Sequence, residues 1–241
     1  MSLKFSEIHR ERIVKAAQQT LWSETSDDVE EARDYLRKTR KISDKVLKEY
    51  SFGYVPKHAR HEWSERIIMP LYDPYGNLAV LTSRKFRSKD KYTHLHETFD
   101  KRYYLYGLNV ARPDILKLNK CIIVEGQFDT TYLRTRGFKT SVGVLGSAFT
   151  LEHACILRRY CSEVYLVFDS DEAGKATLQR SMEMMYDEKI EDTFRMIFVP
   201  VRLPLGYKDP DEFVQANGPI PFRDLLEQSK IEKPALSKRA H

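Results

Sequence analysis

The stretch CIIVEGQFDTTYLR, residues 121–134, decides the fold. It begins with an uninterrupted apolar run, turns at Glu125-Gly126 and continues with helical periodicity. A short strand without polar alternation is typical of a parallel sheet whose two faces are covered by helices. The stretch therefore predicts the first strand and the first helix of a Rossmann-like lobe.

The same alternation of short apolar runs and helical segments continues downstream. We expect strands at 121–124, 141–145, 164–168 and 194–199, and helices at 128–136, 150–160 and 173–186. Right-handed crossovers place successive parallel strands side by side in one sheet. The repeated order thus predicts an α/β fold with a parallel-sheet domain at 119–206, followed by an acidic motif and a short helical tail at 207–241.

Residues 1–118 have a different, mixed α+β pattern. Helical spacing covers 6–22, and Ser26 and Ser43 are expected N-cap residues of a second and a third helix. A hairpin is expected next, with strands at 66–72 and 78–86 around a turn at 73–77. The sequence therefore predicts an N-terminal subdomain of helices and a hairpin, with many basic residues.

Composition excludes several classes of protein. The 241 residues carry 40 Lys and Arg against 35 Asp and Glu, a net charge of +5 that is compatible with a nucleic-acid partner. A hydrophobic fraction of 41% excludes a disordered chain. No apolar run approaches the ~20 residues of a membrane span and no signal peptide is visible, so we expect a cytoplasmic protein, or one in the host cytoplasm if it is viral. The cysteines Cys121, Cys155 and Cys161 form no CxxC pair, so we expect reduced thiols and no zinc in this chain.

Acidic residues follow the predicted strands at the edge where parallel sheets bind ligands. The three pairs are Glu125 with Asp129, Asp169 with Asp171, and Asp209 with Asp211. Helix capping explains a single pair, but three pairs at successive strand ends make capping alone improbable. Clustered carboxylates repel one another, and divalent cations remove that conflict. All-oxygen ligands favour Mg²⁺ or Mn²⁺, and two such ions suit phosphoryl transfer.

Two further segments allow both a functional and a structural interpretation. Basic residues with interleaved tyrosines occupy 84–104, which indicates either a solvated hairpin edge or a groove for single-stranded nucleic acid. Beside a metal site we favour the groove. The small-residue turn at 143–150 contains Gly146 and Ser147 and opens a helix. Its amides are candidates for phosphate binding, while a plain strand-to-helix turn is the more common meaning.

These residues together resemble the bacterial-type (DnaG-like) DNA primases and their TOPRIM fold. The acidic motifs resemble the three metal-binding signatures of that family in order and spacing. Upstream and downstream matches extend the resemblance from about residue 32 to about residue 228; they are Tyr35-Leu36, Arg40, Ile42-Ser43, Phe52-Gly53-Tyr54, Arg66-Ile67, Pro70, Arg84, Lys91-Tyr92, Lys101, Leu105-Tyr106-Gly107, Phe213, Gly218 and Phe222. The resemblance implies a TOPRIM lobe within an RNA-polymerising core.

The resemblance also implies roles. It assigns Glu125, Asp129, Asp169 and Asp171 to catalysis, and these four with Asp209 and Asp211 to metal binding. It places Arg66, Arg84, Lys91, Tyr92 and Lys101 where primases contact template and nucleotide. The implied reaction is attack of a ribonucleotide 3′-hydroxyl on the α-phosphate of the next NTP, on a single-stranded DNA template, with release of pyrophosphate. The implied partners are a replicative helicase and a separate zinc-binding, template-reading protein, with no membrane.

Departures from the family pattern leave alternatives open. Lys41 stands where the family commonly has Gly, Ser170 replaces the middle Gly of the acidic DxD, and Gln127 replaces an aromatic residue. The Cys and His residues of a template-reading zinc domain are missing, and so is a helicase-docking domain. We expect either an excised core or a compact virus- or plasmid-type primase, and the start at Met1 favours the compact one. The alternative functions are a TOPRIM-type metal-dependent nuclease and a non-catalytic helicase adaptor or nucleic-acid-binding module.

Overall fold

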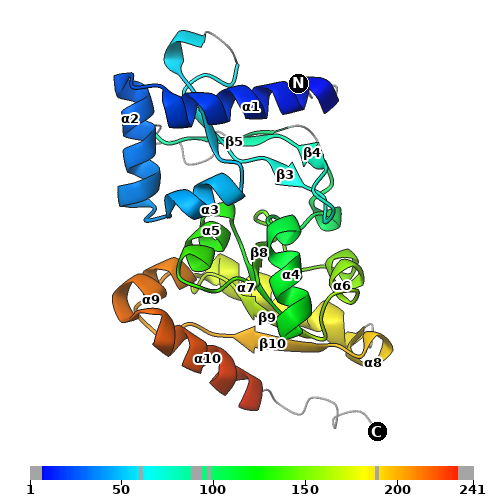
Figure 1. The fold of residues 1–241 in the computed structure, drawn as a ribbon. Coiled ribbons are helices and arrows are strands. Elements are labelled where there is room, and N and C mark those ends of the chain that lie inside the picture. The colour runs from blue at the N-terminus through cyan, green and yellow to red at the C-terminus, as the bar shows by residue number, and fades with distance from the viewer. Residues whose placement is uncertain (1–6, 60–61, 88–93, 97–98, 188–189, 233–241) are drawn as a thin grey trace, which may run out of the picture. The chain divides into compact units, whose positions relative to one another are not determined.

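The computed structural model describes residues 7–59, 62–87, 94–96, 99–187 and 190–232 (Figure 1). The chain divides into two compact units, Met1–Val110 and Ala111–His241. Helix α4 (Leu108–Leu118) leads from one unit into the other. The finer division at residues 118 and 206 stays a prediction. Among the described residues, no helix is long and apolar enough to cross a membrane.

The first unit opens with helices, as predicted. They are α1 (Glu7–Ser23), α2 (Asp27–Asp34), the π-helical turn η1 (Tyr35–Thr39) and α3 (Asp44–Glu49). Ser43 caps α3, because its side chain accepts a hydrogen bond from the Val46 amide. Ser26 precedes α2 as predicted, but its hydroxyl donates to the Asp28 carboxylate instead of capping the backbone.

The predicted hairpin is present in an interrupted form. Its strands belong to an antiparallel sheet of order β1-β2-β5-β6 and to a separate pair β3-β4. The bounds are β1 (Gly53–Val55), β2 (Arg66–Ile68), β3 (Leu71–Tyr72), β4 (Leu78–Val80), β5 (Thr82–Lys85) and β6 (His94–His96), with short 3₁₀ turns η2 (Lys57–Ala59) and η3 (Lys101–Tyr103). The ladder breaks at Pro70, which lacks the amide hydrogen that a continuous strand needs.

Helix α1 packs directly on strand β1 of this unit. A Cβ atom on Gly53 would lie 2.6 Å from the carbonyl carbon of Ala17, so only glycine allows the two backbones to approach this closely. Around this contact Val14, Ala17 and Trp63 are buried with Ile68. The first unit therefore has its own core between its first helix and its sheet.

The second unit is the predicted α/β lobe. Its four strands are all parallel, in the order β10-β9-β7-β8. The strands are β7 (Lys120–Val124), β8 (Ser141–Gly143), β9 (Glu163–Val167) and β10 (Ile197–Val201). The helices are α5 (Gln127–Thr135), α6 (Leu151–Leu157), α7 (Glu172–Asp187), α8 (Ile190–Phe194), α9 (Pro210–Asn217) and α10 (Pro219–Ile231). In this order β7 and β9 are central, and the motifs that follow them are neighbours.

The last strand begins three residues later than the prediction at 194. Phe194 belongs to α8, where its ring lies 4.5 Å from the Arg158 guanidinium carbon. Arg195 then adopts a left-handed φ of 53°, which ends the helix and turns the chain into β10. The prediction failed at this point because a short apolar segment fits a strand and a buried helical turn equally well.

The predicted helical tail is present as α9 and α10, and it joins the core of the same unit. Phe213 of α9 and Phe222 of α10 are buried together with Phe138, and the Phe138 and Phe222 rings meet edge to face at 4.9 Å. Lys230 pairs with Glu163 at 2.6 Å and ties the end of α10 to the start of β9. Cys121 and Cys161 are buried free thiols, whereas Cys155 is exposed.

Candidate metal and nucleotide site

The first two acidic motifs meet at the carboxyl end of the central strands. Glu125 follows β7 directly, and Asp169 follows β9 after Phe168. The backbone amide of Asp169 donates a hydrogen bond to Oε1 of Glu125 over 3.1 Å. Parallel pairing of β7 with β9 brings these two motifs together although they are far apart in the sequence.

Three of the aspartates also cap helices. The Asp129 carboxylate accepts from the Gly126 amide at 2.8 Å, and Asp171 accepts from the Gly174 amide at 2.9 Å. Asp209 accepts from the Glu212 amide at 2.8 Å and caps α9. Capping and ligand binding are compatible, because one carboxylate offers about four lone-pair positions. The capping bonds orient these side chains at the sheet edge.

Five carboxylates at this edge lie close enough for their charges to influence one another. The pKa of Asp169 is raised to about 8, first by burial and then by the charges of Glu125, Asp129 and Asp209, against the opposing charge of Lys208. The pKa of Glu125 is also raised, first by burial and then by Asp171 and Asp209. Such mutual repulsion is expected where several carboxylates surround a cation position.

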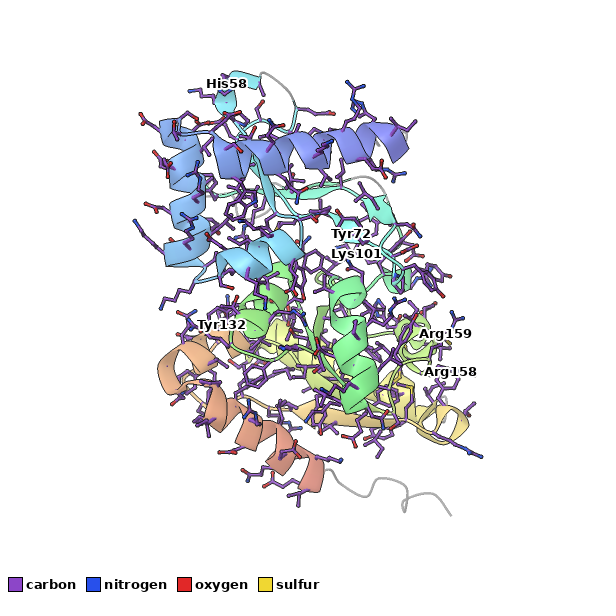
Figure 2. The ribbon with its side chains drawn as sticks, in the orientation of Figure 1. His58, Tyr72, Lys101, Tyr132, Arg158 and Arg159 are labelled. Carbon is purple, nitrogen blue, oxygen red and sulfur yellow. The ribbon has the colours of Figure 1, made fainter. Side chains whose placement is uncertain are left out.

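The sixth acidic residue has different surroundings. Asp211 lies in the first turn of α9 and is only 8% exposed. Burial, and after it the Asp211 charge, raises the pKa of Tyr132 on α5, a residue labelled in Figure 2. Helices α5 and α9 pack on each other, which places Asp211 beside α5. Its role as a metal ligand stays a prediction.

The residues present fit a divalent cation by their chemistry. The donors are oxygens of partly buried carboxylates, which is the ligand set that Mg²⁺ and Mn²⁺ prefer. Within the described ranges, no three Asp, Glu, His or Cys side chains already enclose a cation position. The capping bonds account for this, because each of them holds a carboxylate oxygen on its own helix. A bound Mg²⁺ or Mn²⁺ ion would take carboxylate oxygens from this group, with water and phosphate as its remaining ligands.

The turn at 144–147 supports Glu125 through its own hydrogen bonds. The Gly146 amide donates to the Glu125 carbonyl at 2.9 Å, and the Ser147 hydroxyl donates to the Val144 carbonyl at 2.7 Å. Leu145 and Gly146 both have left-handed φ values, of 60° and 73°. Both groups already serve the turn: the Gly146 amide holds the Glu125 backbone, and the Ser147 hydroxyl closes the turn on Val144. Phosphate binding by Gly146 and Ser147 stays a prediction.

Gly174 packs against the backbone of the loop that follows β9. A Cβ atom at this position would lie 2.1 Å from the Asp169 carbonyl oxygen, so any other residue would displace the Asp169 backbone. The first turn of α7 is thereby in direct contact with the second acidic motif. This contact explains why a glycine follows the motif at this spacing.

The predicted basic residues lie in the first unit, and the two on its sheet strands, Arg66 and Arg84, do not share one face. Arg66 on β2 is buried, and Arg84 on β5 is half-buried. Arg66 pairs with Lys85, and Ile67 pairs with Arg84, so the two arginines point to opposite faces of the sheet. Lys101, labelled in Figure 2, lies on η3. Lys91 and Tyr92 lie outside the described residues.

Sequence reasoning missed two participants in the acidic site. Lys208 places a positive charge close enough to lower the pKa values of Glu125 and Asp169. Ser170 makes two hydrogen bonds to the loop that precedes Asp209. The position of Lys208, directly before an acidic motif, was a usable signal. The bonds of Ser170 join it to residues distant in the sequence, so the residues next to Ser170 gave no signal from which they could be predicted.

The comparisons agree with this geometry. Residues 119–194 match the family model of the Toprim domain. The chain is 37% identical over 174 residues to a DNA primase of Chlamydia pneumoniae, covering 70% of this chain and 28% of that protein. Its fold is similar to the Aquifex aeolicus primase (zinc binding and RNA polymerase domains), with TM-score 0.79, 25% identity and coverage of 93% of this chain and 62% of that one. A DnaG catalytic core matches with TM-score 0.78 and 25% identity, over 92% of this chain and 79% of that one.

The chain spans less than half of the length of the curated relatives it matches, for example 38% of the Neisseria meningitidis primase and 45% of the Aquifex aeolicus one. The similarity therefore concerns one region of those proteins.

Proposed function

Because the chain carries a Toprim domain and is related in sequence and fold to the catalytic core of bacterial-type DNA primases, we propose that it synthesises RNA primers on single-stranded DNA. The observation that carries this proposal is the group of five mutually repelling carboxylates at the sheet edge. Nucleotidyl transfer with two divalent cations requires such a group. The proposed substrates are NTPs, and the product is a short RNA paired with the template.

Each acidic residue has a distinct proposed task. Bound Mg²⁺ or Mn²⁺ ions supply positive charge at the attacking oxygen and at the leaving pyrophosphate. Asp129, Asp169, Asp171 and Asp209 would hold the ions. Bonds from backbone amides orient the carboxylates of Asp129, Asp171 and Asp209, and the Asp169 amide orients Glu125. Oε1 of Glu125 accepts the Asp169 amide, so we assign Oε2 to take the proton of the primer 3′-hydroxyl. Its raised pKa suits a proton acceptor.

The 3′-oxygen then bonds to the α-phosphorus of the incoming NTP, and the bond from that phosphorus to the bridging oxygen breaks. Pyrophosphate leaves with the electron pair. Arg84 and Lys101 in the first unit are the described residues proposed to contact template and nucleotide phosphates. A zinc-binding, template-reading protein is a proposed partner, because a solved relative contains a zinc-binding domain beside its RNA polymerase domain. A replicative helicase is a proposed partner on the resemblance to the primases alone.

The decisive experiment measures incorporation of labelled NTPs on a single-stranded DNA template with Mg²⁺ or Mn²⁺. Replacement of Asp169 by Asn should lower incorporation by roughly 100-fold or more, because a metal ligand is lost. Replacement of the exposed Asp224 on α10 by Asn is the matched control and should leave incorporation unchanged. Undiminished synthesis by Asp169→Asn would refute the metal assignment. Cleavage of the DNA without NTP incorporation would favour a nuclease, and neither activity would favour an adaptor.

A further inference from the structure

Ser170 joins two acidic motifs that lie on different loops. Its hydroxyl donates a hydrogen bond to the Tyr207 carbonyl at 2.6 Å. Its backbone amide donates to the Lys208 carbonyl at 2.7 Å. The residue between Asp169 and Asp171 is therefore bound at two points to the loop that enters Asp209. We call these two bonds the Ser170 clamp.

The clamped loop is in turn bound to α9. The Lys208 amide donates to the Glu212 carboxylate at 2.7 Å, and the Glu212 amide donates to the Asp209 carboxylate at 2.8 Å. A continuous set of hydrogen bonds thus runs from the loop after β9, through Lys208, to the first turn of α9. Movement of either loop would break several of these bonds.

The clamp acts against a repulsive force. The carboxylates of Asp169 and Asp209 repel each other, as do those of Glu125 and Asp209. Without a cation this repulsion favours separation of the two loops, and Ser170 opposes the separation. The same bonds hold Lys208, whose charge partly neutralises Glu125 and Asp169, next to the site.

We propose that Ser170 is a positioning residue that holds the third acidic motif against the second before a divalent cation arrives, and so raises the affinity of the site for that cation. The inference rests on the proposed function only in that these carboxylates bind Mg²⁺ or Mn²⁺. The structure supports it through the hydroxyl bond, which neither Ala nor the Gly typical of the resembling family can make. Those residues retain only the amide bond to Lys208.

The test is calorimetric titration of the full chain with MnCl₂, which does not depend on primer synthesis. Replacement of Ser170 by Ala or Gly should weaken Mn²⁺ binding by about 2- to 10-fold, the usual effect of one lost hydrogen bond. Ser170→Thr keeps a hydroxyl and should bind within about 2-fold of the parent. Ser181→Ala is the matched control. The Ser181 hydroxyl bonds to Thr177 and Phe149 within the fold, so its loss should lower the melting temperature without changing Mn²⁺ affinity.

Equal Mn²⁺ affinities of the parent, Ser170→Ala and Ser170→Gly would overturn the clamp. Weakened binding by Ser170→Thr to the level of Ser170→Ala would overturn it as well, because the hydroxyl would then not be the cause. A parent chain that binds Mn²⁺ but makes no primers would refute the proposed function alone. The Mn²⁺ affinities of the Ser170 variants would still decide whether the Ser170 clamp raises the affinity of the site.

Discussion

Lys41 occupies a backbone conformation that favours glycine. Its φ is 54°, and the chain reverses there after η1, with the Ile42 amide bonded to the Leu36 carbonyl. A left-handed conformation costs a residue with a Cβ roughly 1 kcal/mol, and glycine adopts it freely. This geometry accounts for the Gly that the resembling family commonly has at this position. The departure noted in the sequence is therefore a local strain and not a change in the site.

We expect Lys41→Gly to raise the free energy of unfolding by about 0.5–1 kcal/mol, since the relief of strain exceeds the added flexibility of the unfolded chain. Urea denaturation at an unchanged m-value measures the gain. Lys45→Gly, inside α3, is the matched control and should cost about 1 kcal/mol. A loss of stability in Lys41→Gly as large as that of Lys45→Gly would contradict the assigned strain.

At this scale the sequence predicted which residues carry charge but not how they are held. The acidic motifs were readable because aspartates and glutamates stand at strand ends. The hydroxyl bond of Ser170 to Tyr207 joins positions that only the folded chain brings together. The opposite faces of Arg66 and Arg84 follow from strand register, which a one-residue shift would reverse.

At the scale of elements, periodicity predicted the strands well where they are wholly buried. Strands β7 and β9 begin within one residue of their expected positions, and in both every residue after the first is buried. The interruption at Pro70 and the short helix α8 were missed, because each depends on a local backbone conformation. The ends of strands are therefore less predictable than their centres, and the site lies at strand ends.

The strand-end carboxylates also give the metal-free protein a characteristic pH dependence. The pKa of Asp169 is raised from 3.8 to about 8, so the folded state binds a proton that the unfolded state has released between these values. Folding stability contributed by this group is present below the lower value and is lost as the pH rises through the upper one. A carboxylate in an ion pair has the opposite effect, because its contribution to folding stability is lost as the pH falls.

We therefore expect the melting temperature of the parent to fall relative to that of Asp169→Asn as the pH rises through this range without metal. Saturating Mg²⁺ should remove the decline, because a bound cation favours the ionised carboxylate. Thermal denaturation of both proteins across the range, with and without Mg²⁺, measures the difference. If the melting temperatures of the two metal-free proteins changed with pH in parallel, the raised pKa of Asp169 would be contradicted.

At the scale of the whole molecule, the net charge of +5 is the sum of acidic and basic groups that lie in different units. The acidic site belongs entirely to the unit Ala111–His241, while the proposed template-binding cations Arg84 and Lys101 belong to Met1–Val110. The acidic and basic residues suggested metal binding and template binding. Only the positions of these residues along the chain indicate that different units carry the two functions. The two functions should therefore respond separately to substitution.

We expect Lys101→Ala and Arg84→Ala each to weaken binding of the full chain to single-stranded DNA and to reduce its dependence on salt, by a slope of about one per lost phosphate contact. Asp169→Asn should lower NTP incorporation by roughly 100-fold or more while leaving DNA binding intact, since it removes a negative charge from the other unit. Fluorescence anisotropy at several salt concentrations measures binding, and Lys139→Ala, an exposed cation of the second unit, is the control. If Lys139→Ala reduced the slope and the first-unit variants did not, the template site would have to be reassigned to the second unit.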